Sequence, residues 1–296
     1  MKVTKLRYGF VGAGAIGGAI GGALQHAGYE VKYYDRDKKL STVGSLDQLA
    51  KNSDVIFLCV PSWVVSDVAT ELSQVLGAEQ VVITVAKGVY KDFVTMDDVL
   101  KRVVGKKSGY GLLYGPMLAS EIRNAQPGYG LLALQKTNLS HEIARDLSLG
   151  QIYAESTDDI HSVALCGALK NIYAVGFGVH DGLGFGANTK GALLTRSLIE
   201  MEHIVDQLGG DPLVVLSVAG AGDLLATGWG DQSFNHRVGQ AIALSGMRDD
   251  LVSEGIVSLR EVSSKLSLTQ YPILNVLYRI VQGHTQPETF REVIDV

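Results

Sequence analysis

A glycine-rich turn near the N-terminus constrains the fold of this chain more than any other feature. Residues 6–11 are typical of a short buried strand, the turn Gly12-Ala13-Gly14-Ala15-Ile16-Gly17 follows, and residues 18–27 favour a helix. In such a turn the first glycine permits the tight bend, the second lets the backbone approach a pyrophosphate, and the third lets helix and strand pack closely. The helix start also offers unpaired N–H groups to phosphates. The motif predicts a dinucleotide site; a glycine-rich turn of another α/β protein is the alternative.

An acidic residue stands where a dinucleotide site needs one. A second predicted strand, residues 30–34, ends at Asp35, 18 residues beyond Gly17. A carboxylate at this distance accepts hydrogen bonds from the ribose hydroxyls of adenosine. It also repels a 2′-phosphate, which Arg36 beside it offsets only in part. We therefore predict NAD as the cofactor, preferred over NADP.

The rest of the N-terminal half continues the strand pattern. Apolar runs at residues 54–60 and 81–85 are typical of parallel strands covered on both faces, and further strands are predicted at 112–114, 130–134 and 152–154. The strand signals stop near Asp158, and helical patterns follow. We predict an α/β chain: an N-terminal Rossmann-type doubly wound sheet at residues 1–157, then an all-α C-terminal domain at residues 158–296, which holds the substrate and catalytic groups.

Two lysines stand out from this pattern. Lys170 lies in a predicted helix rich in Gly and Ala, where it either extends to the surface or lines a pocket. The glycine-broken segment 180–186, which we interpret as a loop, favours the pocket. Lys87 follows the predicted strand 81–85, and ligands of parallel sheets bind at the carboxyl ends of the strands. We expect Lys87 on the substrate side; an ordinary solvated loop lysine is the alternative.

Charge, hydropathy and cysteine content exclude several classes of partner. The net charge is −5 and no cluster of Lys or Arg occurs, so we expect no nucleic acid partner. The sequence contains no uncharged apolar run of 18 residues, so we expect no membrane span. It also shows no secretory leader pattern. Two cysteines, Cys59 and Cys166, are predicted to be reduced core residues. The sequence favours a cytoplasmic protein.

Several short motifs together resemble one known family. In chain order they are Gly12-Ala13-Gly14, Val60-Pro61-Ser62, Ala86-Lys87-Gly88, Gly115-Pro116 with Ala119 and Glu121, Ala168-Leu169-Lys170-Asn171, Asp181-Gly182-Leu183-Gly184-Phe185-Gly186, and Ala219-Gly220-Ala221-Gly222-Asp223-Leu224 with Thr227. Over nearly the whole chain, this set resembles the NAD(P)-dependent glycerol-3-phosphate dehydrogenases of the bacterial type. The resemblance implies interconversion of dihydroxyacetone phosphate and sn-glycerol 3-phosphate for glycerophospholipid metabolism, by a homodimer.

The resemblance and the motifs together give a set of candidate site residues and no metal site. The catalytic candidates are Lys170, Lys87 and Asp223. The candidates for substrate binding are Lys87, Gly115, Met117, Lys170, Asp223, Thr227, Ser233 and Asn235. The candidates for cofactor binding are Gly12, Gly14, Ala15, Ile16, Gly17, Asp35, Arg36, Pro61, Lys87, Ala119, Asn235, Val252 and Glu254.

The chemistry of ketone reduction gives these residues distinct tasks. A nicotinamide cofactor provides the hydride, and the protein must place a proton donor at the oxygen. Lys170 suits that task if its pKa is tuned, Lys87 would stabilise negative charge on the oxygen, and Asp223 would orient Lys170. Thr227 would hold a substrate hydroxyl or cap a turn. A related dehydrogenase with another hydroxy or keto substrate is one alternative; a non-catalytic NAD-binding sensor is another, but it needs no proton donor.

One position departs from the family pattern. Phe234 stands where the family carries an arginine that binds the substrate phosphate. Arginine meets a phosphate with a charged, bidentate fork, and phenylalanine offers no such donor. Either His236, Arg237 or Lys190 replaces the arginine, or the substrate carries no phosphate there. Arg237 is closest along a predicted helix, although relatives are also basic at that position.

Overall fold

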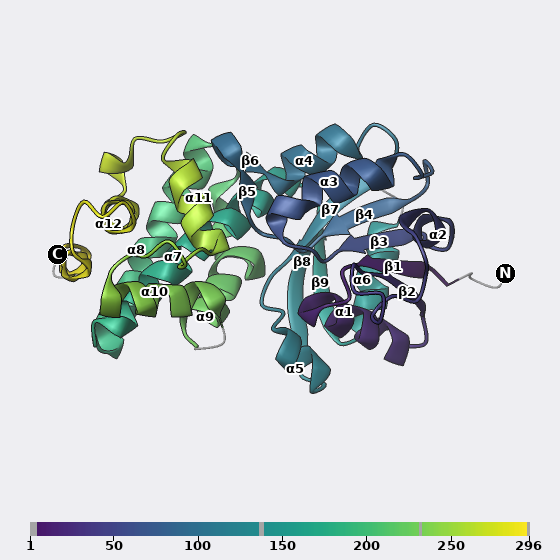
Figure 1. Cartoon of the computed structure of the whole chain (residues 1–296), viewed down its shortest axis with the longest axis horizontal. Coiled ribbons are helices and arrows are strands. Elements are labelled where there is room, and N and C mark those ends of the chain that lie inside the picture. Colours follow the sequence, from purple (N-terminus) through teal and green to yellow (C-terminus); the bar gives the residue numbers. More distant parts are fainter. Residues whose placement is uncertain (1–4, 136–138, 231–232, 295–296) are drawn as a thin grey trace. The chain divides into compact units, whose positions relative to one another are not determined.

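The computed structural model describes residues 5–135, 139–230 and 233–294 and resolves them into two compact units (Figure 1). Unit 1 consists of the described residues up to Ala86 together with Met96–Val163. Unit 2 consists of Lys87–Thr95 and the described residues from Ala164 onward. The segment Lys87–Thr95 therefore belongs with the helical half of the protein, which the sequence analysis did not anticipate.

Unit 1 is built on a seven-stranded sheet with the order β2-β1-β3-β4-β7-β8-β9. Neighbouring strands run parallel except β7 and β8, which pair antiparallel. The predicted strands are all present. Their bounds are β1 Arg7–Val11, β2 Glu30–Tyr34, β3 Val55–Leu58, β4 Val81–Thr84, β7 Gly109–Tyr114, β8 Gly128–Leu134 and β9 Ile152–Thr157.

Helices cover both faces of this sheet, which is why every residue of β3 and β4 is buried. The aromatic core between the strands includes Phe10 and Phe57, whose rings stack with centroids 5.0 Å apart. The helices are α1 Ala15–His26, α2 Leu46–Lys51, α3 Ser62–Ser73, α4 Met96–Val103, α5 Ala119–Arg123 and α6 Ser140–Leu149. The predicted doubly wound α/β architecture of the N-terminal half is confirmed.

The strand order sets the position of the ligand site in unit 1. From β1 the chain moves outward to β2, then returns to the other side of β1 to form β3. The carboxyl ends of β1 and β3 therefore flank a topological switch point, where open α/β sheets bind their ligands. The glycine-rich turn lies at this point, between β1 and α1.

Unit 2 is helical apart from one small hairpin. Its long helix α7 spans Ile160–Gly182, of which residues 164–182 belong to unit 2. The further helices are α8 Ala187–Gln207, α9 Asp223–Gly228, α10 Phe234–Ser245, α11 Glu254–Val262 and α12 Pro272–Val281, and the hairpin pairs β5 Val89–Tyr90 with β6 Val94–Thr95. The predicted helical C-terminal domain is confirmed.

Glycines let α7 and α10 pack with their backbones in contact. A Cβ atom on Gly178 would lie 2.0 Å from the carbonyl oxygen of His236, and one on Gly239 would lie 2.0 Å from that of Val175. No larger residue fits at either position without moving one helix. This close contact fixes the polar residues at the start of α10 beside the middle of α7.

The predicted loop at residues 180–186 is wrong in its first half. Helix α7 continues through Gly182, so His180 and Asp181 are helical and the loop is limited to residues 183–186. The physical reason is packing: a Cβ atom on Gly182 would lie 2.6 Å from the side chain of Ala243 on α10. Gly182 is thus a packing residue and not a helix breaker.

Helix α7 is also more apolar than the sequence analysis assumed. Among the described residues it is the one helix that is long and apolar enough to cross a membrane by length and composition. Every residue of its most apolar stretch is nevertheless buried within the protein. Core helices of globular proteins pass the same test, so this burial accounts for its apolar composition.

Candidate functional site

A cavity of about 500 Å³ opens at the switch point of the unit 1 sheet. Residues that follow β1, β2 and β3 line it, together with residues of α3. Among them are five of the positions singled out by their place in the sequence, namely Gly12, Gly14, Asp35, Arg36 and Pro61. Its location and its lining are those that an adenosine-containing cofactor needs.

The glycine turn has the geometry of a phosphate cradle. Gly12 has a φ of +94°, and a Cβ atom there would lie 2.5 Å from the carbonyl oxygen of Cys59. Nothing lies within 4 Å of the Cβ position of Gly14, so the backbone is open to an incoming group. Gly14 caps α1 without any side-chain hydrogen bond to the first turn. The turn therefore fits the diphosphate of a dinucleotide.

Asp35 has a second role that the sequence did not reveal. One carboxylate oxygen accepts a hydrogen bond from the N–H of Ala13 at 2.7 Å, and the other accepts one from Asp37 at 2.9 Å. The carboxylate both lines the cavity and holds the glycine turn against the end of β2. A substitution at Asp35 thus changes the shape of the turn as well as the charge.

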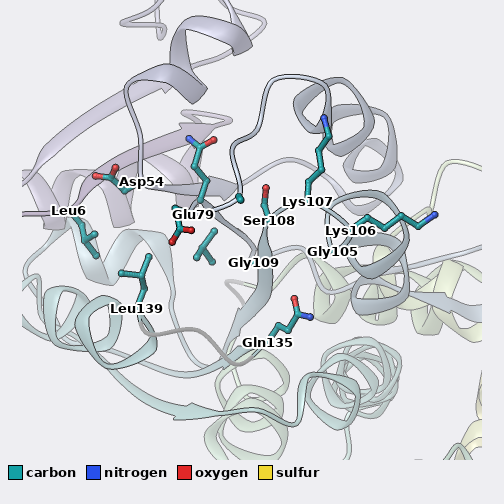
Figure 2. A pocket seen from close by; sticks show the side chains of 13 residues that line it. Leu6, Asp54, Glu79, Gly105, Lys106, Lys107, Ser108, Gly109, Gln135 and Leu139 are labelled. Carbon is teal, nitrogen blue, oxygen red and sulfur yellow. The ribbon is translucent and has the colours of Figure 1, made fainter.

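Another cavity, of about 620 Å³, lies at the amino ends of the strands, the opposite edge of the same sheet (Figure 2). Figure 2 shows the side chains of Lys106 and Lys107 extending away from it. Two polar groups at its wall already have partners: Asp54 pairs with Arg7 at 2.8 Å, and the Ser108 hydroxyl donates to the carbonyl of Gly77 at 2.8 Å. We assign no ligand to this cavity.

In unit 2, Lys170 lies at the centre of a small group of charges. Its side chain is buried, with 4% of the residue exposed, and its Nζ atom lies 3.3 Å from a carboxylate oxygen of Asp223. The Nζ atom of Lys87 lies 2.5 Å from the same oxygen. Lys170 therefore does not extend to the surface, and the predicted association of the three catalytic candidates is present in the structure.

Burial tunes the acidity of Lys170. Desolvation lowers its pKa from 10.5 to about 8; Asp223 opposes this decrease, and the charge of Lys87 adds to it. The next contributions also come from Asp223, as a hydrogen-bond partner, and from Glu254 at the start of α11. A lysine with this pKa is mostly protonated near neutral pH and gives up its proton more readily than an ordinary lysine.

A chain of amide hydrogen bonds surrounds this group. The Asn171 side chain donates to the carbonyl oxygen of Lys87 at 3.4 Å and accepts from the side chain of Asn235 at 3.0 Å. Asn235 in turn accepts from the N–H of Gly255 at 2.9 Å. The chain joins the Lys87 segment, α7, α10 and α11. Asn171 was not among the predicted site residues, although its position next to Lys170 was the available signal.

Two predicted substrate-binding hydroxyls already bond to the backbone. Thr227 donates to the carbonyl oxygen of Asp223 at 2.6 Å, so it ties down the first turn of α9. Ser233 caps α10 and accepts from the N–H of His236 at 3.4 Å. Of the two roles given to Thr227, the structure provides the structural one; substrate contacts by either hydroxyl stay predictions.

Taken together, the candidate site residues fall into two groups, one in each unit. In unit 1, Gly115 has a φ of +152° and packs on the backbone of Tyr129, Met117 lies in the apolar core, and Ala119 begins α5. In unit 2, Val252 is 48% exposed and Glu254 is the first residue of α11. The unit 1 group is Gly12, Gly14, Ala15, Ile16, Gly17, Asp35, Arg36, Pro61, Gly115, Met117 and Ala119, and the unit 2 group is Lys87, Lys170, Asp223, Thr227, Ser233, Asn235, Val252 and Glu254.

The surroundings of Phe234 separate the three basic residues considered as substitutes for the missing arginine. Lys190 and His236 are buried, and both contact one carboxylate oxygen of Asp181, at 2.6 and 2.8 Å. Arg237 is exposed, and its guanidinium carbon lies 5.8 Å from the centroid of the Phe234 ring. Phe234 itself is 56% exposed. Arg237 is thus the candidate on the same surface as Phe234.

The fold and these two groups of residues define a class of protein, a nicotinamide-dinucleotide-dependent oxidoreductase. Models of the NAD-dependent glycerol-3-phosphate dehydrogenase C-terminus and N-terminus match residues 159–292 and 37–140. The model for ketopantoate reductase PanE/ApbA matches residues 8–46, which contain the glycine turn. The chain belongs to the NAD-dependent glycerol-3-phosphate dehydrogenase family.

Individual relatives agree with this assignment. The glycerol-3-phosphate dehydrogenase [NAD(P)+] of Acinetobacter baumannii (strain ATCC 17978) is 31% identical over 313 residues, which cover 95% of this chain and 87% of the relative. That of Alcanivorax borkumensis is 30% identical, with 97% and 92% covered. The crystal structure of glycerol-3-phosphate dehydrogenase from Coxiella burnetii has the same fold, with a TM-score of 0.88 at 24% identity and 99% of both chains covered.

The charge arrangement predicts how an Asp223→Asn variant responds to pH. Asp223 raises the pKa of Lys170, so its neutralisation should lower that pKa below about 8. If protonated Lys170 is the active form in ketone reduction, the rate falls as pH rises through this pKa. The decline should therefore begin at lower pH in Asp223→Asn. The measurement is the pH profile of kcat for NADH oxidation, with Asp206→Asn, an exposed position of α8, as the matched control. An unshifted profile would contradict the pairing.

Proposed function

We propose that this protein catalyses reversible hydride transfer between NAD(P)H and dihydroxyacetone phosphate, and so acts as an sn-glycerol-3-phosphate dehydrogenase. The observation that supports this most directly is the buried Lys170, with a pKa of about 8, beside Asp223 and Lys87. Family membership supports the substrate class, because the relatives are named for this reaction.

The side chains of unit 2 divide the remaining work. When bound, the nicotinamide supplies the hydride. Lys170 donates a proton to the ketone oxygen and, in the reverse direction, accepts it from the alcohol. Lys87 stabilises negative charge on that oxygen. Asp223 holds both ammonium groups and keeps Lys170 protonated near neutral pH.

A non-catalytic NAD-binding sensor is the competing function from another class. Burying an ammonium group is costly unless a partner compensates, and it contributes nothing to sensing a dinucleotide. Lys170 with Asp223 therefore favours an enzyme over a sensor. A related dehydrogenase with a different ketone would use the same three residues, so the choice between those two functions depends on substrate recognition.

Replacement of Lys170 tests the catalytic proposal. We expect Lys170→Ala to lower kcat by about 10²- to 10⁴-fold, the usual contribution of a general acid. The affinity for NADH should barely change, because the glycine turn and its cavity lie in unit 1. Steady-state NADH oxidation and a fluorescence titration with NADH measure the two quantities. Lys265→Ala, at an exposed position of unit 2, is the control. Near-normal turnover in Lys170→Ala would end the assignment.

We propose further that NAD is preferred over NADP. The support is the charge of the unit 1 cavity, which is lined by Asp35 and also by Asp67 and Glu71, one turn apart on α3. A 2′-phosphate entering this cavity would meet three carboxylates, whereas Arg36 offers one positive charge. Like charges at short range disfavour such binding even near a protein surface.

Two substitutions at Asp35 separate its charge from its structural role. Asp35→Asn keeps an oxygen that can accept from Ala13 N–H but removes the charge, so the ratio of kcat/KM for NADH to that for NADPH should fall by about tenfold. Asp35→Ser should lower the same ratio and also weaken both cofactors, because the shorter serine side chain replaces the carboxylate that accepts from Ala13 N–H. Equal or better kcat/KM with NADPH in the unmutated protein would contradict the proposal.

We also propose that the substrate carries a phosphate and that Arg237 binds it in place of the arginine lost at position 234. The support is position: Arg237 is exposed and its guanidinium carbon lies 5.8 Å from the centroid of the Phe234 ring, whereas Lys190 and His236 are buried. The face of the guanidinium can rest on the ring while its N–H groups bond in the plane. The proposal therefore assigns Phe234 an orienting role.

The test compares dihydroxyacetone phosphate with dihydroxyacetone in NADH oxidation. We expect the native protein to prefer the phosphorylated ketone, and Arg237→Ala to reduce this preference by roughly 10- to 100-fold, the usual loss for a charge-assisted hydrogen bond. Arg260→Ala, at an exposed position of α11, is the matched control. No native preference, combined with one created by Phe234→Arg, would instead indicate an unphosphorylated or differently charged substrate.

We propose, finally, a homodimer in the cytoplasm. The resemblance to the family supports the homodimer, and Cys59 and Cys166, which form no disulfide, suit a reducing compartment. Light scattering coupled to gel filtration measures the mass of the particle in solution; a monomer at micromolar concentration would remove the homodimer.

A further inference from the structure

Arg123 contacts the glycine turn from behind, and neither the motifs nor the resemblance gave it a role. It is the last residue of α5, in unit 1. Its Nη2 atom donates to the carbonyl oxygen of Gly14 at 3.0 Å and to that of Ala15 at 2.9 Å. These are the cap and the first residue of α1. One guanidinium thus contacts two consecutive carbonyl groups of the turn that begins the dinucleotide site.

The two carbonyl groups belong to the peptide units that present the first N–H groups of the helix. The carbonyl of Gly14 shares its peptide unit with the N–H of Ala15, and the carbonyl of Ala15 shares its unit with the N–H of Ile16. The first N–H groups of an α-helix have no acceptor within the helix. A cation at the oxygen end of a peptide unit fixes its orientation and polarises the N–H at the other end.

The sequence of α1 leaves room for this contact. A Cβ atom on Gly18 would lie 3.2 Å from the carbonyl oxygen of Ala13 and 3.3 Å from Arg123 Nη2, both tighter than nine in ten real Cβ contacts. With glycine at this position, the guanidinium reaches the carbonyl groups across the surface of the helix. Gly18 thus leaves space both for the Ala13 carbonyl and for the guanidinium of Arg123.

We propose that Arg123 is a positioning residue for the cofactor diphosphate: it orients and polarises the N–H groups of Ala15 and Ile16 and adds positive charge at the start of α1. This inference rests on the proposed function, in which a dinucleotide binds the glycine turn. Arg123 acts through the backbone, so it should affect binding of the phosphates rather than the chemical step.

The inference is tested by measuring how the full-length protein binds three probes, NADH, ADP and adenosine. Binding of ADP and adenosine is measured by the displacement of bound NADH, which is followed by its fluorescence. We expect Arg123→Met to raise the Kd of NADH and ADP by about three- to tenfold, the range for charges at a helix terminus. The Kd of adenosine should change by less than about twofold. Arg123→Lys, which keeps the charge, should restore part of the loss. KM for NADH should rise in Arg123→Met while kcat at saturating NADH stays the same.

Arg102→Met, at an exposed position near the end of α4, removes the same charge elsewhere in unit 1 and should leave all three constants unchanged. An equal loss of ADP and adenosine affinity in Arg123→Met would overturn the inference, because a merely structural contact between α5 and α1 predicts it. Unchanged affinities would overturn it as well. Failure of the native protein to bind NADH would instead overturn the proposed function, so the two failures are distinguishable.

Discussion

The charged group around Lys170 in unit 2 depends on the burial of one ammonium group. An uncompensated charge among apolar side chains costs several kcal/mol, so Lys170 requires a partner, and Asp223 is that partner. The same carboxylate also binds Lys87, which places two positive charges around one negative charge. The surplus of positive charge contributes to the low pKa of Lys170. It also suits a site where negative charge develops on a substrate oxygen.

This requirement explains why distant parts of the chain meet in unit 2. Lys87 lies before the hairpin β5–β6, Asp223 begins α9, and Lys170 lies in the middle of α7. The Asn171 and Asn235 amides fasten the same region to α10 and α11. A substitution that removes one of these side chains leaves its hydrogen-bond or ion-pair partners on the other elements without a ready replacement. It therefore changes the stability of those elements too, because buried amides and charges have few alternative partners.

Sequence reasoning predicted the elements better than the contacts between them. The glycine turn, the strands and Lys170 were recognised because local patterns encode them: apolar runs, a fixed glycine spacing, and a lysine in an apolar helix. The end of α7 was placed too early because a glycine that packs against Ala243 looks the same in sequence as one that breaks a helix.

Other features that were not predicted from the sequence depend on long-range contacts. The assignment of Lys87–Thr95 to unit 2, the bond from Ala13 N–H to Asp35, and the approach of Arg123 to α1 each join residues far apart in the chain or in separate elements. No periodic pattern records such pairs. The acidity of Lys170 belongs to this group too, since the sequence provides the lysine but not its burial or its partner.

The departure at Phe234 lies beside a cluster of charged residues in unit 2. Asp181 accepts from three neighbours, His180, Lys190 and His236, and these donors outweigh the effect of burial, so its pKa lies below the ordinary value. Lys190 also lies over the Trp229 ring, at 5.0 Å from its centroid. The cations of this cluster are thus held by protein groups. The guanidinium carbon of Arg237 lies 5.8 Å from the centroid of the Phe234 ring. Under the function proposed here, Phe234 orients this arginine for the substrate phosphate.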